Sequence, residues 1–159
     1  MADVSSETTS FVDKGRKVVN QVMSWYELIP GWLVGALARF SMFSVFWQSG
    51  QTKVDGFTIL PKTYWLFENE YKVPLLPPDV AAVLATVSEH LFSVLLLVGL
   101  ASRFSATALL FMTLVIQLFV YPDAWREHIL WMMALLYIMS YGPGALSLDR
   151  LVKGAPDKK

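Results

Sequence analysis

The sequence contains no cysteine, and this absence removes several classes of chemistry. Structural disulfides, thiolate metal sites and redox reactions carried by the protein's own thiols are all excluded. Only two histidines are present, and two imidazoles without a thiolate are too few for a usual structural metal site. The sequence therefore predicts no metal ligands and no covalently bound cofactor.

Charge is also scarce. Charged residues make up 16% of the chain, and the formal net charge is zero. No run of lysine or arginine indicates a nucleic-acid partner, so we expect none. Hydrophobic residues, in contrast, make up 55% of the chain, more than in ordinary soluble domains. This composition predicts an integral membrane protein whose first partner is the lipid bilayer.

Four apolar segments have close to the length that a bilayer-spanning helix requires, which is about 20 residues. Aromatic residues stand at the ends of several of them, as in the aromatic belts at the two membrane surfaces. The sequence thus predicts an all-α membrane protein, a four-transmembrane-helix bundle within residues 30–151. The expected spans are residues 32–49, 80–100, 104–121 and 124–141.

The remaining segments are more polar. We expect residues 1–10 to be a disordered tail and residues 152–159 to be a polar tail. Residues 11–29 place most of their apolar side chains on one stripe, which predicts an amphipathic helix in the membrane interface. A loosely ordered leader is the alternative. Residues 50–79 contain four prolines and are expected to form an extramembrane loop, with a short helix over residues 63–71.

The distribution of basic residues predicts the orientation in the membrane. Eight lysines and arginines fall on the side of the two termini, and four fall on the side of the long loop. Because the cytoplasmic side carries the excess of positive charge, both termini are expected in the cytoplasm.

Two ionisable residues lie deep within the expected spans. Arg39 is seven residues, roughly 10 Å, above the inner end of its span, and Glu89 is eleven residues, roughly 16 Å, above the inner end of the next. A long arginine side chain can cover that difference, so the sequence predicts an Arg39–Glu89 ion pair. The pair either belongs to a functional site or fixes the packing register of two helices.

Further polar residues gather toward the outer ends of the spans. His128, Gln117, Trp47 and Lys53 are expected to line an outward-facing polar pocket above the ion pair. A role for His128 as an ordinary hydrogen-bonding residue at the interface is the alternative. Haem ligation between His90 and His128 is not expected, because their depths differ by roughly 9 Å and axial ligands share one level.

Several sequence segments carry a resemblance to a known family. They include Arg39 and Glu89 within the spans, His128, and the segments GQTK (50–53), FENEYKVPLLPPDVAA (67–82), VGLASRFSA (98–106), MTLVIQLFVYPDAW (112–125) and GPGALSLD (142–149). This pattern resembles the DoxX family of bacterial inner-membrane proteins, which is related to the DoxD-like small subunit of thiosulfate:quinone oxidoreductase. The resemblance implies a multi-pass protein of the bacterial inner membrane.

The resemblance also implies a membrane subunit of an oxidoreductase system, with a quinone or small-anion site among the helices. Glu89 and His128 are the candidates for proton handling, since quinone reduction consumes protons. The candidates for contact with the ligand are Arg39, Lys53, Trp47 and Gln117. A partner protein subunit is expected, and electrons come either from this subunit or from the substrate. The alternative is a non-catalytic membrane anchor or transporter-like component, and the sequence leaves open both enzymatic activity and homo-oligomer formation.

Overall fold

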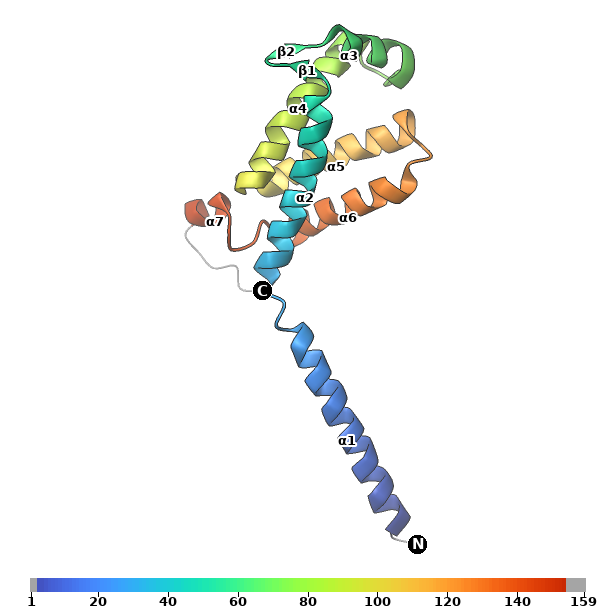
Figure 1. The fold of residues 1–159 in the computed structure, drawn as a ribbon, viewed down its shortest axis with the longest axis vertical. Coiled ribbons are helices and arrows are strands. Elements are labelled where there is room, and N and C mark those ends of the chain that lie inside the picture. The colour runs from blue at the N-terminus through green and yellow to red at the C-terminus, as the bar shows by residue number, and fades with distance from the viewer. Residues whose placement is uncertain (1–2, 154–159) are drawn as a thin grey trace.

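The computed structural model describes residues 3–153, with side chains for residues 13–152. Helices dominate this part of the chain, and one long helix projects away from the others (Figure 1). The elements in order are α1 (Asp3–Tyr26), α2 (Gly31–Gln51), β1 (Val54–Asp55), β2 (Thr58–Ile59), α3 (Pro61–Leu66), the π-helical turn η1 (Phe67–Tyr71), α4 (Pro78–Val98), α5 (Ser102–Val115), the π-helical turn η2 (Ile116–Val120), α6 (Trp125–Tyr141) and α7 (Leu148–Lys153).

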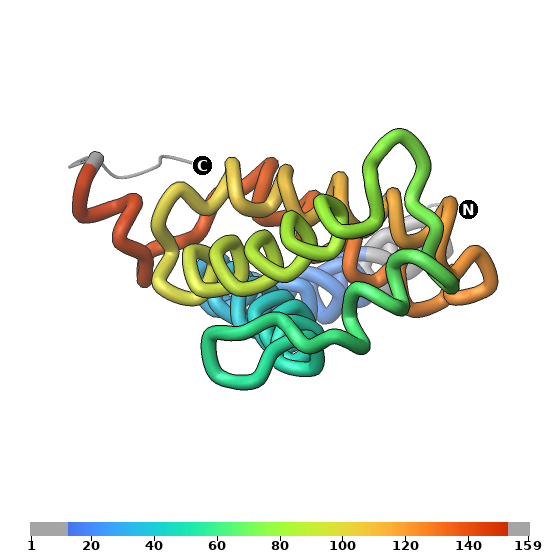
Figure 2. Tube along the Cα trace, turned by 90° about the horizontal axis from the view of Figure 1, so that it is seen from above, coloured from blue at the N-terminus to red at the C-terminus, as the bar shows by residue number. Residues whose placement is uncertain are grey.

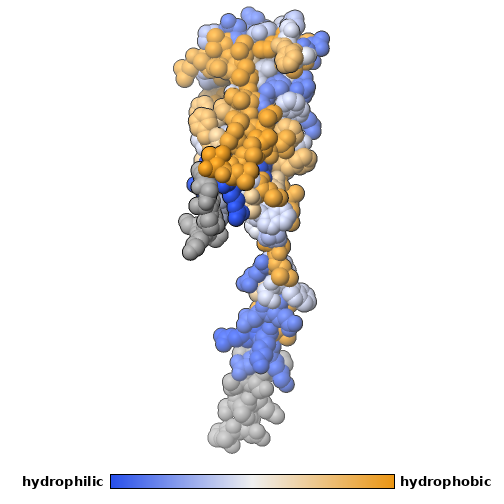
Figure 3. Space-filling model, turned by 90° about the vertical axis from the view of Figure 1, so that its left-hand side faces the viewer, coloured by the Kyte–Doolittle hydropathy of each residue, from blue (hydrophilic) through white to orange (hydrophobic). Residues whose placement is uncertain are grey.

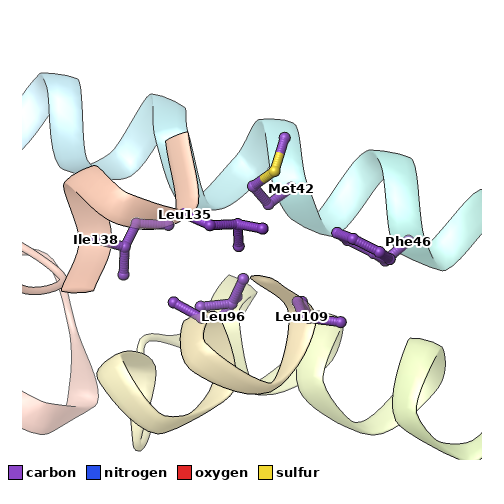
Figure 4. Close-up of a cluster of buried hydrophobic side chains, with 7 residues drawn as sticks. Met42, Phe46, Leu96, Leu109, Leu135 and Ile138 are labelled. Carbon is purple, nitrogen blue, oxygen red and sulfur yellow. The ribbon is translucent and has the colours of Figure 1, made fainter. Parts of the chain in front are cut away.

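Four helices form the body of the molecule. α2 packs against α4 and α6, and α5 packs against the same two helices. Viewed from above, α4 lies between α2 and α5 (Figure 2). The apolar core between them is drawn in Figure 4, and each helix contributes to it. Its buried members are Met42, Phe46, Leu96, Ala106, Leu109, Leu135 and Ile138.

The distribution of polarity differs from that in a soluble protein. Large apolar side chains cover the outer faces, for example Leu91 and Phe111, which are exposed by 50% and 69%. Several hydroxyl side chains are fully buried instead, among them Ser93 and Thr113. The apolar outer surface is visible over the body of the molecule in Figure 3. A lipid environment accounts for both observations.

Two helices are long and apolar enough to cross a membrane: α4 and the continuous helix formed by α5 and η2. A third span results if α1 and α2, which are bent by 48° at their junction, are counted together. The helix α6, which covers the last expected span, has 17 residues. The helices therefore match the four expected spans in position, whereas length and composition support two to three membrane crossings.

The expected loop at residues 50–79 is more ordered than the sequence indicated. A two-stranded antiparallel hairpin pairs Val54 with Ile59, and the following helix α3 continues into η1. This segment packs along the first half of α4, where Phe67 of η1 lies against Ala81 and Ala82. We call this end of the molecule the hairpin end.

The opposite end, which we call the Arg39 end, is fixed by the connection between α4 and α5. α4 ends at Gly99, whose φ of 73° is the left-handed conformation common at helix C-termini. Asp149 then accepts hydrogen bonds from the backbone N–H groups of Ala101 and Ser102, both at 2.8 Å. A carboxylate at this position caps the N-terminus of α5.

One expectation for the terminal segments is wrong within the described residues. α1 begins at Asp3, so residues 3–10 are helical and not a disordered tail. Acidic residues favour the N-terminal turns of a helix, and the segment from Asp3 carries two. At the other end α7 extends through Lys153, so its last two residues belong to the expected polar tail. Residues 1–2 and 154–159 lie outside the described residues.

Candidate functional site

The most buried charge at the hairpin end is the Glu89 carboxylate, which lies near the middle of α4. Its side chain is 3% exposed, and the side chain of its partner Lys53 is 12% exposed. The Lys53 Nζ lies 2.8 Å from Oε2 and 3.0 Å from Oε1 of Glu89. Ser49 Oγ donates a third contact, a hydrogen bond of 3.1 Å to Oε1. An ion pair with an added hydroxyl donor reduces the cost of burying either charge alone.

The position of Lys53 follows from the place where α2 ends. α2 stops at Gln51, and Gln51 Nε2 lies 3.1 Å from His90 Nε2 at the middle of α4. Lys53 follows immediately, and its Nζ also donates to Ser49 O at 3.1 Å and Ser49 Oγ at 3.0 Å. The ammonium group is thereby held at the level of Glu89, not above it as the sequence suggested.

The predicted Arg39–Glu89 ion pair is wrong. Ser49 lies opposite Glu89, and Arg39 is ten residues earlier on α2, which is about 15 Å along the helix axis. The prediction assumed that the two helices end at one level. α2 instead extends past the C-terminus of α4 at the Arg39 end, so the arginine cannot reach the carboxylate.

Arg39 is instead bonded to backbone carbonyl groups at the end of α4. Its Nη1 donates to Leu96 O at 3.3 Å and Leu97 O at 3.2 Å, and its Nη2 donates to Leu146 O. The last carbonyls of a helix lack intrahelical donors and carry partial negative charge. Arg39 therefore joins α2, α4 and the segment before α7, which is a structural role.

His90 forms part of the same α2–α4 contact. Its Nδ1 lies 2.7 Å from Thr86 O, so this nitrogen carries the proton, and Nε2 accepts from Gln51. The ring packs edge-on against Trp47 at 5.2 Å. A Cβ on Gly50 would lie 2.7 Å from the ring, so the absence of a side chain there allows the close approach.

His128 and Gln117 form a second buried polar pair, between α6 and η2. His128 Nδ1 lies 2.7 Å from Gln117 Oε1, and Gln117 Nε2 donates to Pro122 O at 2.7 Å. The carbonyl of Pro122 can only accept, which fixes the orientation of the amide and places the proton of His128 on Nδ1. Among residues 13–152, Nε2 of His128 forms no hydrogen bond.

The ring of His128 also contacts the core. The centroid of the imidazole ring lies 4.8 Å from that of the Trp131 ring. Trp131 in turn packs edge-on against Phe46 of α2, with ring centroids 5.9 Å apart. Aromatic rings therefore connect the His128 pair with the segment of α2 that leads to Ser49.

The two π-helical turns meet at the hairpin end through a pair of tyrosines. Tyr121 donates a hydrogen bond of 3.4 Å to the hydroxyl of Tyr71, and their rings lie 5.8 Å apart. Burial, followed by the hydrogen bond to Tyr121, raises the pKa of Tyr71. Its phenol therefore remains a neutral hydrogen-bonding group. π-helical turns are frequent at functional sites, and both of these adjoin the buried polar residues.

The six candidate residues thus separate into three groups. Glu89 and Lys53 form the first group, and Trp47 packs against the neighbouring His90. Gln117 and His128 form the second group. Arg39 lies apart from both, at the opposite end. Sequence reasoning missed Ser49 and Tyr71, although Ser49 stands four residues before Lys53, a spacing that places both on one helix face. Among the described residues, no group of three His, Asp or Glu side chains could hold a metal ion.

Comparisons with known proteins assign the chain to a family. The DoxX family model matches residues 34–122, which is more than half of the chain. The chain belongs to the DoxX family. The match contains Arg39, Lys53, Glu89 and Gln117, and it ends before His128 and before the capping residue Asp149.

One similar protein is an uncharacterised protein of Haemophilus influenzae. It is 29% identical to this DoxX protein over 129 residues, covering 74% of this chain and 82% of the relative. No solved structure matches the chain. Family membership and the apolar helices together identify a membrane protein.

Proposed function

We propose that this DoxX protein is the membrane subunit of an oxidoreductase system and holds a quinone among its helices. The observation that carries the proposal is the Glu89–Lys53 pair, a buried carboxylate and ammonium at the middle of a membrane-length helix. Ionisable residues at that depth are costly and usually mark ion, proton or substrate sites. Reduction of a quinone consumes two protons with two electrons, so the site needs groups that exchange protons.

His128 provides a second proton-exchanging group. Its Nδ1 is hydrogen-bonded to Gln117, whereas Nε2 forms no hydrogen bond among residues 13–152. A protonated Nε2 can donate to a quinone carbonyl, and a neutral Nε2 can accept from a quinol hydroxyl. Under this proposal Gln117 and Trp131 orient the imidazole, and the ligand is bordered by Trp47 of α2 and by Lys53, which follows α2.

The charges favour a neutral ligand over a small anion. Lys53 is neutralised by Glu89, and Arg39 is bound to carbonyl groups at the other end of the molecule. Among residues 13–152, no uncompensated cation therefore remains beside the buried carboxylate. A quinone headgroup has no charge and needs only hydrogen-bonding partners and apolar walls, which the aromatic side chains of Phe46 and Trp131 supply.

We further propose that α2, α4, α5 with η2, and α6 all cross the bacterial inner membrane, with both termini in the cytoplasm. The outer face of α6 supports this, since Leu130 and Met133 are exposed by 60% and 65%. Apolar side chains at these positions suit lipid. Electrons would then come from a partner subunit, because the chain has no cysteine with which to hold a redox centre such as an iron–sulfur cluster.

The test is to purify the full chain gently from membranes and to measure bound quinone per protein by mass spectrometry. We expect quinone in the wild type. Glu89→Gln and His128→Ala should each lower quinone affinity by about tenfold or more, since a hydrogen bond to a charged group contributes about 1.5–3 kcal/mol. Thr107→Val is the control, because Thr107 is an exposed hydroxyl that bonds only to its own helix at Arg103 O.

A Glu89→Gln/Lys53→Met variant removes both charges and serves if the single variant fails to fold. Equal quinone content in all the variants, or none in the wild type, would reject the quinone site. Co-purification of another protein without quinone would support the second reading, a non-catalytic membrane partner.

A further inference from the structure

The helix α1 carries an apolar face that the rest of the chain does not cover. Within the described residues α1 makes no extensive contact with any other element, and it projects away from the body (Figure 1). Its apolar side chains are accordingly open: Val19 is exposed by 59%, Met23 by 59% and Trp25 by 62%. An apolar surface of this kind on a 24-residue helix requires a covering environment.

The arrangement of side chains around α1 indicates what covers it. At 3.6 residues per turn, the apolar residues from Trp25 around to Met23 occupy an arc of about 160°. Lys14 adjoins one border of this arc, and Arg16 adjoins the other. Lys17 lies on the polar face, with Asp13 near its middle. Basic side chains at both borders of a wide apolar arc are typical of helices that lie on anionic membranes.

The same pattern disfavours pairing with a second copy of α1. A two-stranded coiled coil buries a narrower seam, and its flanking positions usually carry opposite charges. No acidic residue flanks the apolar arc of α1 over residues 13–26, so two copies would place like charges beside each other.

The Arg39 end as a whole has the same character. α7 lies at this end, because Asp149 N donates to Gly99 O at 2.8 Å. Leu151 and Val152 of α7 are each exposed by 77%, and Arg103 and Arg150 are exposed beside them. Basic and apolar side chains therefore accompany α1 at one end of a membrane protein.

We propose that α1 lies on the anionic surface of the leaflet at the Arg39 end. Val19, Met23 and Trp25 enter the acyl-chain boundary, and Lys14 and Arg16 contact lipid phosphates. α1 now stands at 48° to α2, and the break at residues 27–30 contains Pro30 followed by Gly31, which has no atom near its missing Cβ. A pivot of about 40° at this break, or less for a tilted α2, brings α1 into the membrane plane. This inference is independent of the proposed quinone site.

The absence of cysteine makes the test direct. Single cysteines are introduced into the full chain as Val19→Cys, Met23→Cys, Asn20→Cys or Ser24→Cys. Each variant is spin-labelled and placed in nanodiscs of phosphatidylcholine with and without phosphatidylglycerol. Paramagnetic resonance then measures the access of oxygen and of a water-soluble nickel complex to each label. We expect labels at Val19 and Met23 to favour oxygen, and labels at Asn20 and Ser24 to favour nickel. In the anionic discs, Lys14→Gln and Arg16→Gln should each lower the ratio of membrane-inserted to water-exposed α1 about fivefold.

Three results would overturn the proposal. Equal nickel access at all four positions would place α1 in water. Exclusion of both reagents from Val19 and Met23, with a short label-to-label distance between copies, would make α1 a self-association helix. Insertion that does not depend on phosphatidylglycerol or on the two charges would remove the anionic lipid as the ligand.

Discussion

Lys53 and Glu89 each depend on the other, more than on any third side chain, to compensate a buried charge. Each side chain neutralises the charge of the other in a buried environment. Oε1 of Glu89 accepts a hydrogen bond both from Lys53 Nζ and from Ser49 Oγ. When one member of a buried ion pair is removed, the remaining charge has no compensation. The energetic effect of either substitution is therefore governed by the partner that is left behind.

We expect Lys53→Met and Glu89→Gln each to lower the free energy of unfolding by about 3–5 kcal/mol. The double variant should lose much less than the sum, because no uncompensated charge remains. Unfolding in mixed micelles, analysed as a double-mutant cycle, measures the coupling. Strictly additive losses would show that the pair does not act as a unit.

At the scale of elements, the end of α4 and the segment before α7 approach each other closely at Gly99. Gly99 ends α4 with a positive φ, and a Cβ at this residue would meet Nη1 of Arg39 and lie 2.6 Å from Cβ of Ser147. The close approach brings the arginine to the helix end, so the residue is constrained both in conformation and in volume.

Gly99→Ala should destabilise the protein by about 2–4 kcal/mol, which combines left-handed strain with overpacking. Gly56→Ala is the matched control, because Gly56 has a φ of 58° and no atom within 4 Å of a Cβ placed there. That variant should show the conformational cost alone, about 1 kcal/mol. Thermal unfolding of both variants in one detergent makes the comparison, and equal shifts would contradict the packing argument.

The sequence predicted helices at the four apolar segments because their length and composition are local properties. The prediction was wrong where a contact depends on how far one helix is shifted along its axis relative to its neighbour. Arg39 and Glu89 were paired by counting from helix ends assumed to be level, and the offset of α2 separates them. Lys53 could not be placed beside Glu89, since its position depends on α2 ending at Gln51, halfway along α4.

The pairing of Gln117 with His128 was only partly accessible from the sequence. Both residues were expected at one level, and the structure does join them. The tautomer of His128 was not predictable, because it depends on the carbonyl of Pro122, which fixes the amide of Gln117.

At the scale of the whole molecule, the orientation in the membrane has a direct test. Phe57 lies at the tip of the hairpin and Leu151 lies in α7 at the opposite end, and both side chains are widely exposed. In intact cells, a membrane-impermeant maleimide should label Phe57→Cys, whereas Leu151→Cys should react only after permeabilisation. The native chain has no cysteine and provides a clean background. The reverse labelling pattern would invert the proposed topology.

The offset that ends α2 halfway along α4 also bears on biogenesis. α4 and the α5–η2 helix are apolar, sufficiently long and joined by a tight turn. This pair of helices can therefore partition from the translocon into lipid as one unit. α2 has Arg39 within it and Lys53 just beyond its end. The carboxylate that neutralises Lys53 and the helix-end carbonyl groups that bind Arg39 are absent until α4 is synthesised. We therefore expect the first helix of the body to enter the bilayer stably only after synthesis of the helices that follow it.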